Sequence, residues 1–349
     1  MNKHLHVMIA ALLVAGGCQQ QTSDNQPATP NPAPLDKESK MPDDQFPGKK
    51  YRDAFAGLAA QYERKAQLEP DNAAVYADLS ENYSTLWCFG FYARNDALPK
   101  AKAAAEKAVL LNEKFGFAHT AMGMVRLFDW DWIGAEREFV RAIQLNPKEP
   151  RSHHWYALYL SAMGRYDQAM EESTQAEKLD PSSLGFKTGK GAILYFGHKF
   201  EEMKKQMLAT VAPAPDFPWG YDWLGMAYVQ LGDFGQAIKT YQKAAELSDR
   251  TAEVLAGLGH AYGKAGRKSD GEKVLEELDR YAAQWYVPPV QMAYVCFGLG
   301  EETRAFELLE KAFQLRAWEL VFIQVEPWFD SYRSDPRFIN LQQRMNFPK

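Results

Sequence analysis

Small and apolar residues recur with a period of 34 over residues 116–317, and this regularity is the main feature of the sequence. Glycine stands at one position of the period in four units, at Gly164, Gly232, Gly266 and Gly300. Seven residues earlier every unit has a small residue, at Gly123, Ala157, Gly191, Gly225, Gly259 and Ala293. Five residues after the glycine position come Ala135, Ala169, Met203, Ala237, Gly271 and Ala305. Each unit therefore predicts two helices that cross closely, because small residues at a crossing shorten the distance between helix axes.

The pattern extends beyond these six units in both directions. A further unit begins at about Ala73 and carries nine extra residues around "WCFGFYARNDAL", an insertion apolar enough to predict packing. Residues 51–68 predict an amphipathic N-terminal capping helix. After the last unit, Ser334 or Asp335 can cap a helix with Pro336 in its first turn. Because one helix pair cannot bury its apolar faces alone, the units must stack.

The period and the stretches "FDWDWIGAEREFVRAIQLNP" and "HHWYALYLSAMGRYDQAMEESTQAEKLDP" resemble the tetratricopeptide repeat (TPR). Together with "WELVFIQVEPWFDSYRSDPRFINLQQRM" they are similar to the repeat half of bacterial winged-helix regulators, protein kinases and adenylate cyclases. No effector domain precedes the repeats in this sequence, so those activities are not expected. The resemblance implies an all-α, right-handed solenoid of about seven repeats with capping helices at both ends.

The N-terminal residues predict an export signal. Residues 7–17 are apolar and small, and "VAGGC" resembles the lipobox of bacterial lipoproteins, which implies cleavage before Cys18 and its lipidation. The alternative is an ordinary signal peptide that leaves Cys18 free. By the same resemblance Gln19 favours the outer membrane, facing the periplasm. We expect a signal peptide at 1–17, a proline-rich tether at 18–50, the solenoid at 51–317 and a C-terminal capping segment at 318–349.

The resemblance implies that the first helices line a concave inner wall. The stripe left free by core packing is aromatic and methionine-containing with few charges, which suits an extended or apolar peptide. The predicted partner-binding residues are Phe117, Met124, Arg151, His154, Leu158, Tyr195, Trp219, Asp222 and Met226. The alternative is that several of them pack against neighbouring units or against the insertion. We expect a protein-binding scaffold, and as the second hypothesis a lipoprotein that binds a small ligand or glycan.

Enzyme chemistry and nucleic-acid binding find no support in the sequence. The adjacent His153 and His154 would point about 100° apart on a helix and do not converge on a metal ion. His119 lies one repeat before His153, but no third ligand accompanies them. No HExxH, phosphate-binding loop or GxSxG motif occurs. The net charge is −5 without a basic stripe, so we expect no nucleic-acid partner, no cofactor and no catalysis.

Overall fold

The computed structural model describes residues 46–348, and this part of the chain contains helices and turns without a strand. The signal peptide, Cys18 and the predicted tether up to residue 45 lie outside the described residues. The α-helices are α2 (Lys49–Leu68), α3 (Ala73–Cys88), α4 (Arg94–Leu111), α5 (Gly116–Phe128), α6 (Trp132–Leu145), α7 (Pro150–Ala162), α8 (Tyr166–Leu179), α9 (Leu184–Phe196), α10 (Phe200–Val211), α11 (Pro218–Gln230), α12 (Phe234–Ser248), α13 (Ala252–Lys264), α14 (Lys268–Ala282), α15 (Pro289–Leu299), α16 (Glu302–Gln314) and α17 (Pro336–Arg344). Two 3₁₀ helices, η2 (Trp318–Phe322) and η3 (Pro327–Tyr332), separate α16 from α17.

Helices α3 to α16 form the seven predicted pairs. The periodic glycine ends the first helix of a pair: Gly164, for example, follows α7 with φ +71°, a left-handed conformation that glycine adopts without strain. Trp130 and His198 occupy the same position of the period and adopt the same conformation, with φ +62° and +57°. The backbone of the turn is therefore repeated even where the glycine is not.

The small residue in the middle of each first helix allows the predicted close crossing. A Cβ atom placed on Gly123 would lie 2.8 Å from the ring of Phe139 in α6. A Cβ atom on Gly225 would likewise lie 2.8 Å from the ring of Tyr241 in α12. Real Cβ atoms do not approach this closely, so the aromatic ring of the second helix occupies the space that the missing side chain leaves.

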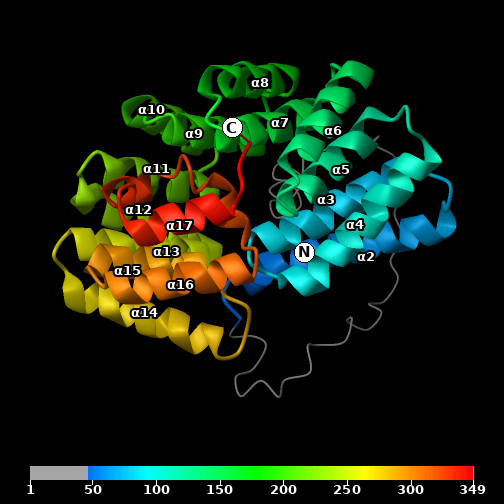
Figure 1. Ribbon diagram of the computed structural model, residues 1–349. Helices are drawn as coiled ribbons and strands as arrows, with labels where there is room; N and C mark the ends of the chain where they lie inside the picture. The colour runs from blue at the N-terminus through cyan, green and yellow to red at the C-terminus, as the bar shows by residue number, and fades with distance from the viewer. Residues whose placement is uncertain (1–45, 349) are drawn as a thin grey trace.

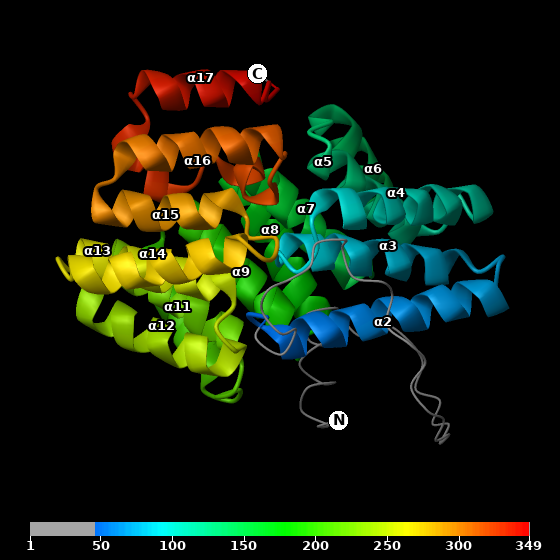
Figure 2. The same cartoon turned by 90° about the horizontal axis from the view of Figure 1, so that it is seen from below.

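The pairs stack into an array that winds back on itself. They run from α3 and α4 on the right of Figure 1, past α7 and α8 at the top, to α13–α16 at the lower left. In Figure 2 the first helices (α2–α6) and the last (α13–α17) form two neighbouring stacks. The Gly48 N–H donates to the carbonyl of Asp249 at 2.7 Å, and the Trp132 indole donates to the carbonyl of Met345 at 3.1 Å. Both ends of the described chain are therefore held by distant repeats.

The two predicted caps are present. Asp335 accepts a hydrogen bond from the Arg337 N–H at the start of α17, and Phe338, Leu341 and Met345 are buried on its inner side. At the other end α2 begins at Lys49 and Phe46 is already buried, so the folded part starts before the predicted boundary at residue 50. Among residues 46–348 no helix is both long enough and apolar enough to cross a bilayer.

Candidate functional site

The nine residues predicted to bind a partner lie on the first helices α5, α7, α9 and α11, but the protein's own chain covers most of them. Seven are buried, and only His154 and Met226 keep moderate exposure. They divide into groups with different neighbours, so the structure does not show one open groove. That these residues bind a partner stays a prediction.

Trp219 lies in an aromatic contact between the N-terminus and the middle of the array, here called the seam. Its ring centroid is 4.7 Å from that of Tyr51 in α2 and 5.1 Å from that of Phe89 in the predicted insertion. The Tyr51 hydroxyl donates to the Leu247 carbonyl at 3.1 Å. The insertion thus packs, as predicted, and it does so across the seam. The seam comprises Phe46, Tyr51, Phe55, Phe89, Phe91 and Trp219.

Arg151 binds carboxylates of its own chain. Its guanidinium lies 2.8 Å from Asp78, 3.1 Å from Glu81 and 3.0 Å from Glu149. It also stacks over the ring of Phe117, 3.5 Å from the centroid. Burial alone would lower the pKa of Arg151, but the three carboxylates raise it, so the guanidinium stays charged. Arg151 and Phe117 therefore connect α7 to α3 and α5.

The histidines contact groups of their own chain. His153 Nδ1 contacts the Glu172 carboxylate, and its Nε2 lies 3.0 Å from the Pro147 carbonyl. One repeat earlier His119 contacts Glu138 at 2.7 Å and the Glu113 carbonyl at 2.8 Å in the same way. In both cases the ring joins the second helix of the pair to the turn before the first. His154 packs against Phe186 with ring centroids 5.3 Å apart.

Met124 is buried within α5. The other four predicted residues, Leu158, Tyr195, Asp222 and Met226, lie against residues 317–332, here called the strap. The strap contains η2 and η3 and contacts helices from five different repeats. Phe322 stacks on Phe196 at 4.5 Å, Trp318 meets Phe128 at 5.8 Å, and Trp328 stacks on His260 at 4.4 Å. The Tyr195 hydroxyl donates to Glu326. The segment predicted as a cap thus also covers the inner helices.

A cavity of about 120 Å³, here called the inner chamber, lies between the inner helices and the strap. It brings together three predicted residues, Leu158, Asp222 and Met226. The strap contributes residues that the sequence analysis did not select: Trp318, Glu319, Phe322, Glu326 and Trp328. The sequence feature that could have pointed to them is the apolar run of residues 318–329. A segment that only closed the array against solvent would be more polar.

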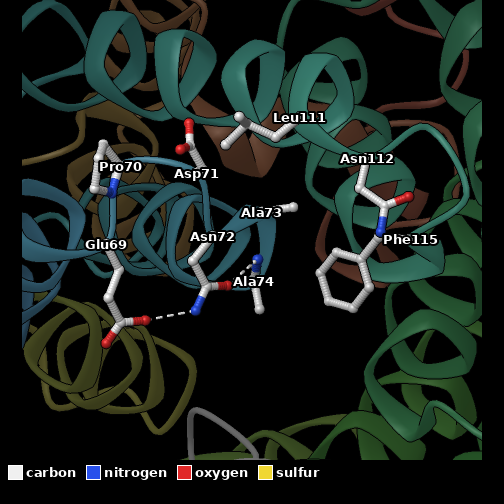
Figure 3. Close-up of a pocket in the computed structure, with 9 residues that line it drawn as sticks. All are labelled: Glu69, Pro70, Asp71, Asn72, Ala73, Ala74, Leu111, Asn112 and Phe115. Carbon is white, nitrogen blue, oxygen red and sulfur yellow. Dashed lines mark hydrogen bonds between the residues drawn. The ribbon is translucent and has the colours of Figure 1, made fainter.

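A larger hollow, of about 670 Å³, lies between the α2–α3 turn and the α4–α5 turn (Figure 3). Its polar groups already serve the helix ends. Asn72 Oδ1 accepts from the Ala74 N–H at 3.0 Å, and Asn72 Nδ2 donates to Glu69 at 2.6 Å. The hollow is therefore a capping turn, and its size does not make it a binding site.

Comparisons with known proteins agree with the fold. Models of the TPR repeat and of the tetratricopeptide repeat match residues 225–266 and 138–171. A chain in the crystal structure of the APC/C hetero-tetramer Cut9–Hcn1 is similar over 83% of this chain, with 16% identity and a TM-score of 0.59. This chain covers 52% of the Cut9–Hcn1 chain, about half its length.

Two further structures have TM-scores below 0.5. Yeast Tom70 covers 84% of this chain, with 63% of its own length matched, 18% identity and a TM-score of 0.49. PilW, described as a type IV pilus biogenesis factor, covers 59% of this chain, with 91% of its own length matched, 17% identity and a TM-score of 0.48. Such repeats are typical of non-catalytic scaffolds for protein–protein interaction. The predicted fold is confirmed for residues 46–348, which form an all-helical solenoid of stacked helix pairs, and tetratricopeptide-repeat models match two segments of it.

Proposed function

We propose that this protein is a membrane-tethered scaffold whose inner helices bind a short segment of a partner protein. One observation carries the proposal: the inner helices already hold a short segment, the strap, through separate aromatic anchors. A surface that receives its own chain in this way can receive a similar segment from another protein. The partner segment would exchange with the strap, so the strap is the competitor that sets the apparent affinity.

The strap indicates the chemistry of the partner segment. Phe322 and Trp328 supply large rings, and Glu326 supplies a carboxylate that accepts from Tyr195. Burial of such rings dominates the affinity of small interfaces. We therefore propose a partner segment with two aromatic residues and one acidic residue between them. Arg151 is engaged by three carboxylates and is not available to such a segment.

The membrane tether is the second part of the proposal. Lipidation of Cys18 would anchor the chain, and a coil of about 30 residues would place the repeats roughly 30 Å from the bilayer. We propose the outer membrane, facing the periplasm. A Cys18→Ser variant is expected to lose labelling by palmitate and to move to the soluble fraction. A variant that stays labelled at another residue, or that remains in the membrane fraction, would contradict the anchor.

Exchange of the strap tests the binding face directly. A fluorescent peptide with the sequence of residues 317–332 is titrated into the full chain and into a Phe322→Ala variant, with a scrambled peptide as control. Because Phe322→Ala weakens the internal strap, this variant should bind the peptide at least tenfold more tightly than the native chain does. If neither protein prefers the strap peptide to the scrambled one, the inner helices do not exchange their occupant.

A further inference from the structure

The carboxyl groups that line the inner chamber have no basic side chain beside them in the lining. Four carboxyl groups line it: Asp222 on α11, Glu253 on α13, and Glu319 and Glu326 on the strap. Its lining contains no lysine, arginine or histidine. Carboxylates inside a folded domain are normally paired with cations, because an unpaired buried charge is costly. A chamber with this composition lacks its positive partner within the residues that line it.

Several polar groups in the chamber wall have no partner within residues 46–348. Asp222 lines the chamber and is 3% exposed. Gln291 Oε1 and Glu319 Oε1 are buried acceptors without donors, and the buried Tyr241 hydroxyl is also unpaired. Native proteins satisfy nearly all such groups. The indole Nε1 of Trp328, also in the wall, is an unpaired donor. The unpaired oxygens of Gln291 and Glu319 call for a group that donates hydrogen bonds.

The arrangement does not suit a metal ion. Within the described chain no three carboxylate, histidine or cysteine side chains stand close enough to share one ion. The carboxyl groups come from α11, α13 and the strap. The rings of Trp318, Trp328 and Tyr294 complete the wall. Aromatic faces attract organic cations, which favours an ammonium group with an aliphatic chain over a hydrated metal ion.

The volume limits the size of the ligand. A cavity of about 150 Å³ accepts benzene, which has about six heavy atoms. The inner chamber, at about 120 Å³, is somewhat smaller. A flexible aliphatic chain of about that many heavy atoms can fit where Met226 and Trp223 keep part of the wall accessible. Larger polyamines and sugars would not fit without displacement of the strap.

We propose that the inner chamber is a binding site for a short aliphatic diamine, with one ammonium group at Asp222 and Glu253 and the other at Glu319 on the strap. The ammonium N–H groups donate to Asp222 and to the unpaired Glu319 Oε1 and Gln291 Oε1. The aliphatic chain lies against Trp318 and Trp328. The ligand links the strap to α11 and α13 and replaces repulsion between their carboxylates with attraction.

Burial disfavours the ionised form of the carboxyl groups in the chamber. It raises the pKa of Glu253 and of Glu319 to about 7, and it raises the pKa of Asp222 as well, with a further contribution from the charge of Glu253. At neutral pH the empty chamber therefore holds a mixture of neutral and ionised carboxyls. A bound diamine favours the ionised forms.

The proposal is tested with putrescine and its neutral analogue 1,4-butanediol, which has the same length and no charge. Isothermal titration calorimetry and thermal melting are recorded on the full chain at constant ionic strength. Putrescine should bind at one site and raise the melting temperature, and butanediol should do neither. Asp222→Asn should weaken putrescine binding at least tenfold, whereas Glu171→Gln, at an exposed position on α8, should leave it unchanged.

The melting temperature of Asp222→Asn separates a role in ligand binding from a role in holding the fold together. Because asparagine keeps the shape and removes a buried charge, Asp222→Asn should fold and melt no lower than the native chain. Glu319→Gln provides the same test from the strap if the first variant does not fold. The proposal is overturned if putrescine produces no heat and no shift, which would indicate a chamber filled by water. It is equally overturned if butanediol binds as well, or if both chamber variants keep native affinity.

Discussion

The two places where the array closes on itself differ in chemistry. At the seam, Tyr51, Phe89 and Trp219 pack ring against ring, and main-chain contacts such as Gly48 to Asp249 complete the joint. At the strap, rings also pack, but Glu319 and Glu326 are buried with them and Trp328 Nε1 has no partner. The seam is built mainly from rings and main-chain contacts, with Thr251 Oγ1 beside Gly48 as an unpaired group, whereas the strap adds buried carboxyl groups to its unpaired groups.

This difference assigns the two closures different roles. Apolar contacts with satisfied hydrogen bonds have little reason to open, and they stabilise one state. Buried carboxyl groups without cations oppose closure and make it sensitive to pH and to ligands. The seam is therefore the permanent joint of the array, whereas the strap is the part from which regulation and exchange are expected.

The largest effect should follow loss of the seam. Trp219→Ala removes a ring that is 3% exposed and contacts both α2 and the insertion. Such truncations cost about 3–5 kcal/mol, so the free energy of unfolding in urea should fall by that amount. Leu110→Ala, at an 80% exposed site on α4, is the control and should change little. An equally small effect of Trp219→Ala would mean that the seam does not hold the array.

The strap should make stability depend on pH. Burial raises the pKa of Glu326 from its ordinary value of 4.5 to about 7, even though the Tyr195 hydroxyl opposes this. Tyr294, Arg333 and Asp330 are its other charged or titratable neighbours. A carboxyl whose pKa is raised by folding contributes stability below about pH 4.5, and this stability is lost as the pH rises through about 7.

A shift of this size corresponds to about 3 kcal/mol. The free energy of unfolding of the native chain should therefore fall between pH 4.5 and pH 8, and for Glu326→Gln this fall should be smaller by about 3 kcal/mol. Urea unfolding at both pH values measures it. Because the histidine pairs are the same in both proteins, the difference isolates Glu326. Parallel pH profiles of the two proteins would show that Glu326 is not the group that titrates.

A smaller effect is expected when the strap loses an anchor. Phe322→Ala removes the ring stacked on Phe196, which should lower the free energy of strap opening by about 2 kcal/mol. Limited trypsin digestion should then cleave at Arg316 or Arg333 faster than in the native chain, while the repeats stay protected. Simultaneous loss of protection in α11 and α13 would indicate that strap and array unfold together.

The smallest effect concerns a histidine–glutamate contact that occurs within each of two neighbouring helix pairs. Burial would lower the pKa of His153, but hydrogen bonds to Glu172 and the Pro147 carbonyl raise it. The stability from this pair is present below about pH 6.5 and is lost as the pH rises through the pKa of the folded state. Glu172→Gln should cost about 1 kcal/mol at pH 6 and less at pH 9, whereas the neighbouring Glu171→Gln should cost little at either. A cost that does not change with pH would exclude a charged His153.

The repeats could be predicted from sequence because their determinants are local. The left-handed residue at Gly164 and the small residue at Gly123 each act within one helix pair, and the period of 34 repeats that arrangement. Capping by Asp335 is local in the same sense. Where the turn lacks glycine, at Trp130 and His198, the neighbouring repeats still predict the conformation.

The closures could not be predicted in this way. The contact between Tyr51 and Trp219 joins residues far apart in the sequence, and it depends on how far the array turns over several units. Asp222 was among the residues predicted on the inner stripe, but Glu319 and Glu326 lie in a segment without the repeat period. Three of the predicted residues, Leu158, Asp222 and Met226, line the chamber, whereas the segment that covers it was not predicted to do so.

Hydrogen–deuterium exchange on the native full chain tests the central claim most directly, because it measures the opening free energy of each segment separately. The account predicts that residues 46–59 exchange only with global unfolding, whereas residues 317–332 open at least 2 kcal/mol more easily at pH 8, and less easily at pH 5 than at pH 8. Equal protection of the two segments at both pH values would contradict it.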